Sequence, residues 1–286
     1  MIARIAGAGA RGILVALLVT TPALMLPGTV TDANQITMLI ALLASFLTFV
    51  EYNSKYPSIV EFRDAPPFNR LRFASLFAIV IVLTLILKHK SDPSGISQAL
   101  TSIGTILGNA MDFPFSPVRM IVLMLPENSD FALVESVRVS AGMAYLISLI
   151  SMAAFVFLVR VLNWPTRKGA FNVWVNMPLF DPTAGGDVIN RLRRDARINI
   201  VLGFLLPFVI PAVVKAASDL IDPITLEHPQ TQIWTVAAWA FLPASMIMRG
   251  LALSKIADMI GEKRRRAYAA EKKAETDDNK KNMQPA

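Results

Sequence analysis

The sequence predicts an all-α integral membrane protein with about six transmembrane helices. Hydrophobic residues make up 54% of the 286 residues and charged residues only 17%, whereas soluble domains carry roughly 25% charged residues. The mean hydropathy is +0.50. The apolar residues are also gathered into runs of about 17 to 23, the length that an α-helix needs to cross a hydrocarbon core of about 30 Å.

The expected spans alternate with polar segments along the chain. They lie near residues 12–30, 35–50, 71–87, 139–162, 198–216 and 232–253. The first run leaves two interpretations open, because the basic start with Arg4 and Arg11 is also typical of a secretory signal peptide. The apolar run continues past Pro22, so we prefer an uncleaved first span.

The distribution of basic residues predicts that both chain termini are cytoplasmic. Residues 160–197 contain seven Lys and Arg against three Asp, and residues 53–72 contain four Lys and Arg. Residues 217–231, in contrast, contain three acidic residues and no Lys or Arg. Cytoplasmic loops of membrane proteins are enriched in Lys and Arg, so this pattern predicts an N-in, C-in protein of the bacterial cytoplasmic (inner) membrane. Residues 88–90 are basic on the opposite side and conflict with the rule.

Residues 91–138 form the least ordinary loop and are expected on the outer side. Apolar residues recur at helical spacing between Ile96 and Ala110, and a second short apolar run covers residues 118–125. Neither run is long enough to span a membrane. We favour an amphipathic helix lying in the membrane interface. A re-entrant hairpin shielded from lipid and ordinary soluble packing remain the alternatives.

The composition removes several classes of site. The chain has no cysteine and two histidines, so disulfides, thiolate metal sites and cysteine nucleophiles are excluded. No signature of a nucleotide-binding loop, a serine hydrolase or a zinc protease is present. The net charge of +7 is explained by topology and does not call for nucleic acid. We therefore favour a protein that is not an enzyme and that binds no cofactor or metal.

Charged residues in the spans are expected near the span ends. Glu51, Arg160, Lys215 and Arg249 occupy such positions, where long side chains reach the headgroups. Coupled carriers usually need ionisable groups at mid-membrane depth, so the pattern speaks against coupled transport.

The connector at residues 163–197 carries the candidate contact residues. They are Arg191, Arg193, Arg194, Arg197, Trp164 and Trp174. The arginines are expected to lie on a short helix along the membrane surface and to contact anionic lipid. A protein partner is the second interpretation, because aromatic residues and Arg carry most interface energy. Simple topological anchoring is the third.

Two further patterns concern helix packing. Ser140, Ala144 and Ser148 recur every four residues, and small residues at this spacing let another helix approach closely. Prolines interrupt the last two spans at Pro207, Pro211 and Pro243. A proline removes a backbone donor, so each marks either a packing kink or a functional break; we favour kinks.

Two functional hypotheses follow. The first is a non-enzymatic scaffold or accessory subunit of a membrane complex, which recruits partners through the connector and the charged tail at residues 254–286. This tail is expected to continue the sixth helix and then to become disordered. A homo-oligomer is a further possible partnership. The second hypothesis is a transporter or channel for an uncoupled or apolar solute, using the proline-kinked helices.

Overall fold

The computed structural model describes residues 2–27, 31–165, 171–181, 185–218 and 226–282, which form helices and contain no strand. Six helices in this part of the chain are long and apolar enough to cross a membrane. They are α1 (Ile2–Met25), α2 (Thr31–Asn53), α3 (Phe68–Lys88), α6 (Phe131–Arg160), α8 (Val188–Ser218) and α9 (Pro229–Asn282). The predicted fold class, an all-α membrane protein with about six spans, is therefore confirmed.

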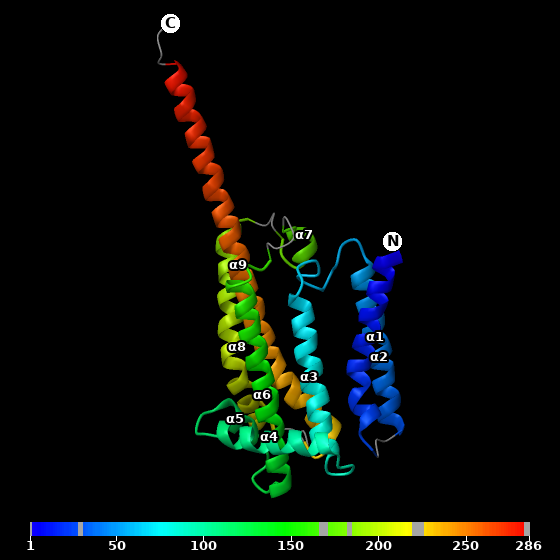
Figure 1. Cartoon of the computed structure of the whole chain (residues 1–286). Coiled ribbons are helices and arrows are strands. Elements are labelled where there is room, and N and C mark those ends of the chain that lie inside the picture. The colour runs from blue at the N-terminus through cyan, green and yellow to red at the C-terminus, as the bar shows by residue number, and fades with distance from the viewer. Residues whose placement is uncertain (1, 28–30, 166–170, 182–184, 219–225, 283–286) are drawn as a thin grey trace.

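The long helices run up and down, so the connections are sorted onto two ends of the bundle (Figure 1). The start of α1, the loop at residues 54–67 and the short helix α7 (Val173–Asn176) lie at one end, and the last part of α9 projects from it. We call this the connector end. The helices α4 (Gly95–Met111) and α5 (Pro117–Leu123) lie at the opposite end.

Several helices extend beyond the apolar runs that predicted them. The first helix begins at Ile2 rather than near residue 12, and α9 continues through the charged tail to Asn282. The reason is that an apolar run marks only the part of a helix that hydrocarbon covers, whereas backbone hydrogen bonds continue to the next stop signal.

The helix α4 lies across the end of the bundle, roughly perpendicular to the spans (Figure 1). Ser94 caps its first turn in a reciprocal capping box with Ser97. Small residues face the protein: a Cβ on Gly142 of α6 would lie 2.7 Å from the Cα of Gly108. The apolar side chains Ile96, Ile103 and Ile106 are exposed instead. The position of this helix in the membrane interface stays a prediction.

The buried core is divided between the middle of the bundle and the connector end. The middle is filled from α3, α6 and α9, with fully buried residues such as Ile79, Ala144 and Val236. The connector-end core contains Phe62, Trp164 and their neighbours. The α1–α2 hairpin stands to one side. Within the described residues, α2 packs on α1 alone, and α1 joins the hairpin mainly to α3.

Candidate partner-binding site

A buried aromatic cluster joins three segments at the connector end. Phe62, Phe68, Phe155 and Trp164 are all at most 3% exposed. Their ring centroids are 4.6 to 6.0 Å apart, which is the range of favourable aromatic pairs. The indole N–H of Trp164 also donates to the carbonyl of Ala65 at 3.0 Å. The connector is thus held against the loop that precedes α3.

A second link runs from α7 to the same loop. Asn176 is buried, and its carbonyl accepts a hydrogen bond from the N–H of Phe62 at 2.6 Å. Its side-chain oxygen accepts from the N–H of Asp64 at 2.9 Å. A buried loop needs partners for its backbone groups, and one asparagine supplies two of them. The sequence offers no signal for this pairing, because the partners are 112 residues apart.

An ion pair ties the loop to α9. The guanidinium of Arg249 donates to both carboxylate oxygens of Glu61, at 2.5 and 2.8 Å. The Glu61 side chain is 9% exposed. Arg249 is therefore paired within the protein rather than extended to the headgroups, as its position near a span end had suggested. A charge inside an apolar span is costly without a partner. The presence of Arg249 in the sixth span could therefore have predicted a buried carboxylate near it.

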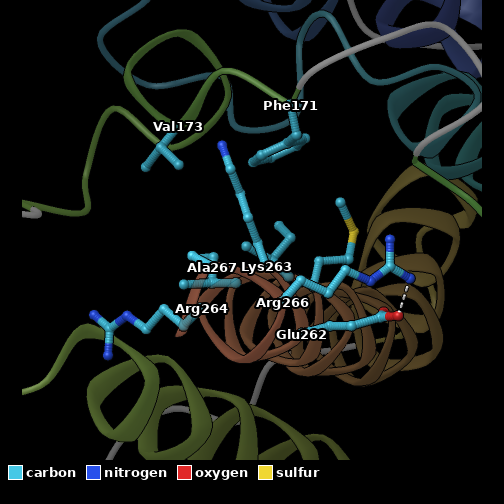
Figure 2. Close-up of a pocket in the computed structure, with 10 residues that line it drawn as sticks. Phe171, Val173, Glu262, Lys263, Arg264, Arg266 and Ala267 are labelled. Atoms are coloured by element: carbon cyan, nitrogen blue, oxygen red, sulfur yellow. Dashed lines mark hydrogen bonds and ion pairs between the residues drawn. The ribbon is translucent and has the colours of Figure 1, made fainter. Parts of the chain in front are cut away.

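A pocket of about 680 Å³ opens between α9 and the connector (Figure 2). Its apolar surface comes from α9, with Ile256, Met259 and Ile260, and from Phe171 before α7 and Val173 at its start. Charged residues of α9 line it as well. Figure 2 shows Lys263 extending from α9 towards Phe171 and Val173, while Arg266 pairs with Glu262. We call this the connector pocket. It combines apolar surface with an available cation.

Ion pairs fix the helices that flank the connector pocket. Arg264 of α9 contacts Asp187 at 2.6 Å, and Arg193 of α8 contacts Asp258 of α9 at 3.1 Å. The hydrogen bond from Arg264 holds the pKa of Asp187 below its ordinary value. A lowered pKa means that this contact is kept at neutral pH and is lost only when acidification passes below that pKa.

The four predicted arginines lie on the first turns of α8 itself. The helix runs unbroken from Val188 into the span, so there is no separate helix along the membrane surface. The physical reason is that Leu192 and Ala196 are buried against α9, which holds this segment upright. Arg191 contacts the ring of Phe180 and the carbonyl of Asp181, and Arg197 donates to the carbonyl of Arg193. Arg194 is exposed beside Asp195.

The two predicted tryptophans have different outcomes. Trp164 is 3% exposed, so it belongs to the core of the connector end. The prediction that it contacts lipid or a partner protein is therefore wrong. The signal for this burial is weak, since an interfacial and a buried tryptophan look alike in sequence. The side chain of Trp174 lies outside the described residues.

Ser140, Ala144 and Ser148 are all at most 1% exposed on α6. Gln232 of α9 donates to the hydroxyl oxygens of Ser136 and Ser140, at 3.1 and 3.2 Å. The small side chains therefore lie where α6 meets its neighbours, and a buried hydrogen-bond network accompanies the contact. Sequence reasoning did not identify Gln232, whose amide is the polar group that the serines satisfy.

The prolines Pro207, Pro211 and Pro243 are buried where α8 packs on α9. Pro211 has no N–H to offer the carbonyl four residues earlier, which is that of Pro207. The indole N–H of Trp239 takes this place and donates to the Pro207 carbonyl at 2.9 Å. Close packing continues nearby, because a Cβ on Gly203 would lie 2.7 Å from the carbonyl oxygen of Pro243. The break that Pro211 makes in the hydrogen-bond ladder is thus filled by the side chain of Trp239.

The fold defines an integral membrane protein with six candidate spans and an elaborated connector end. Across the described ranges, no three His, Asp or Glu side chains are grouped to hold a metal ion. No protein-family model, curated protein or solved structure matches the chain. Any functional assignment therefore depends on the geometry of the chain itself.

Proposed function

We propose that this protein is a non-enzymatic scaffold or accessory subunit of a membrane complex, and that it docks a partner protein at its connector end on the cytoplasmic side. The observation that carries the proposal is the length of α9. This helix leaves the bundle and continues as one projecting rod (Figure 1), and residues 262–276 are exposed along their whole length.

A solvated rod of this kind is unusual without a partner. Isolated helices are marginally stable in water, and most helices owe their stability to the packing of one face. Residues 262–276 carry six Lys and Arg against three Glu, so the surface they offer is basic. We call this segment the α9 arm. It suits a partner whose contact surface is acidic.

The connector pocket lies at the base of the α9 arm and supplies the apolar part of the interface. Docking surfaces combine an apolar centre with a polar rim, and the pocket joins Met259 and Ile260 to Lys263 in this way. An acidic segment with a bulky apolar side chain fits both features. The alternative of an uncoupled transporter finds less support, because Trp239 and the close α8–α9 contact occupy the proline-kinked region.

Affinity purification from native membranes in mild detergent tests the proposal. The full chain is compared with a chain ended after Ala269, with Lys263→Glu in the connector pocket and with the matched control Lys90→Glu, an exposed residue that follows α3 at the opposite end of the bundle. We expect one fixed partner to co-purify with the full chain, and the shortened chain and Lys263→Glu to lose most of it. Lys90→Glu should retain the partner as the full chain does. Absence of a fixed partner, or equal recovery by all four chains, would refute the proposal.

A further inference from the structure

A second pocket system lies away from the connector pocket, between the α1–α2 hairpin and α3. Its polar part has a volume of about 400 Å³ and is lined by residues of α1, α2 and the following loop, among them Arg4, Arg11, Tyr52 and Arg63. Its apolar part has a volume of about 170 Å³ and is lined by Leu14, Val15 and Phe73, with Arg70 at its edge. Arg11 and Tyr52 line both parts, so the two are neighbours.

The polar part is built to hold an anion. Arg4, Arg11 and Arg63 face a single carboxylate, that of Asp64, which Arg63 already contacts at 3.3 Å. Arg63 is also occupied by the carbonyls of Glu51 and Ser54, at 2.9 and 2.8 Å. Positive charge from Arg4 and Arg11 is therefore left in excess.

Arg11 is held in place at the junction of the two parts. Its guanidinium lies over the ring of Tyr52, 4.7 Å from the centroid, and donates to the carbonyl of Gly7 at 2.7 Å. A guanidinium carries several N–H groups in a planar fork that matches phosphate oxygens. Arg11 can keep the bond to Gly7 and still donate to a phosphate. Because its side chain is already held in place, phosphate binding costs little additional side-chain entropy.

The apolar part has the form of a slot for hydrocarbon. Its walls come from α1, α2 and α3, and Figure 1 shows the α1–α2 hairpin standing beside α3. Thr48 donates its hydroxyl to the carbonyl of Ala44 at 2.8 Å, which satisfies its polar group within the helix. Phe73 stacks with Phe77 further along α3, so the apolar wall continues into the span.

From this juxtaposition we infer that the crevice binds one anionic phospholipid, with its phosphate at Arg4, Arg11 and Arg70 and an acyl chain along Leu14, Val15 and Phe73. The charge of the rim selects an anionic headgroup, and the attached apolar slot selects a lipid over free phosphate. Tyr52 lines both parts, and tyrosines are enriched at membrane interfaces. The lipid fills the crevice between the α1–α2 hairpin and α3.

Native mass spectrometry and thermal denaturation of the full chain in detergent test the inference. The probes are phosphatidylglycerol, phosphatidylcholine and inorganic phosphate. We expect phosphatidylglycerol to remain bound and to raise the melting temperature, and the other two to do neither. Arg11→Gln combined with Arg70→Gln should reduce retention roughly thirtyfold, since each cation near the surface contributes roughly a fivefold attraction to anionic lipid.

A matched variant and a second pocket variant keep the test decisive. Arg194→Gln with Arg197→Gln removes the same charge from α8 and should retain the lipid as the unaltered chain does. Leu14→Trp fills the apolar slot while keeping every arginine, and it should also lower lipid retention. The inference is overturned if inorganic phosphate stabilises the chain as well as phosphatidylglycerol does, if both arginine pairs lower retention equally, or if neither does.

Discussion

At the scale of single residues, several buried polar groups are paired with partners from distant parts of the chain. The indole N–H of Trp239 donates to the Pro207 carbonyl, which Pro211 leaves without a backbone donor. The Gln232 amide donates to two serine hydroxyls, and the Arg249 guanidinium donates to the Glu61 carboxylate. In hydrocarbon an unsatisfied polar group costs several kcal/mol. Each of these pairs therefore has a large effect on stability when only one member is removed.

Glu61→Ala should destabilise the protein by about 3 kcal/mol, because breaking a buried ion pair leaves an uncompensated charge. Thermal denaturation in detergent measures the effect. The double variant Glu61→Leu with Arg249→Met removes both charges and should recover most of the loss. Equal destabilisation by the single and double variants would mean that the ion pair itself is not what holds the loop to α9.

Trp239→Phe should cost about 1–3 kcal/mol, since the Pro207 carbonyl would remain buried without a donor. Trp234→Phe is the control, because Trp234 lies on the same helix and is only partly buried. Comparison of the two melting temperatures in detergent separates the hydrogen bond from the general loss of an indole. A smaller loss of stability for Trp239→Phe than for Trp234→Phe would contradict a stabilising role for the hydrogen bond between Trp239 and the Pro207 carbonyl.

At the scale of elements, helices meet where side chains are small. The middle of α6 is an example, because Ala144 has no exposed surface whereas Ala153, further along the same helix, is exposed. The α8–α9 pair uses the same device, since a Cβ on Gly250 would lie 2.7 Å from the carbonyl oxygen of Ala196. Close backbone approach is what small residues contribute in membrane helices.

Ala144→Leu should therefore destabilise the bundle by about 1–3 kcal/mol through overpacking. Ala153→Leu adds the same atoms on an exposed surface and should change stability by less than about 0.5 kcal/mol. Melting temperatures in detergent measure both. If the two substitutions are tolerated equally, the small residues of α6 have no packing role.

At the scale of the whole molecule, the spans were predictable and their connections were not. Hydropathy depends only on neighbouring residues in the sequence, so the apolar runs were enough to predict the six long helices. The connector end depends on contacts between distant segments: Glu61 and Arg249 are 188 residues apart, and Trp164 and Ala65 are 99 residues apart. No periodicity encodes such pairs. The candidate site was accordingly predicted only as a region, and Trp164 was assigned to its surface rather than to its core.

The sidedness of this bundle underlies the proposed function, because a partner in the cytoplasm can reach the connector end only if that end is cytoplasmic. The chain has no cysteine, so single cysteines report position cleanly. The exposed residues Asn128, at the α4–α5 end, and Gly185 and Ala270, at the connector end, are suitable sites. With intact cells and a membrane-impermeant thiol reagent, we predict that Asn128→Cys is labelled and that Gly185→Cys and Ala270→Cys are labelled only after the membrane is opened. Labelling of Gly185→Cys or Ala270→Cys from outside intact cells would contradict the account.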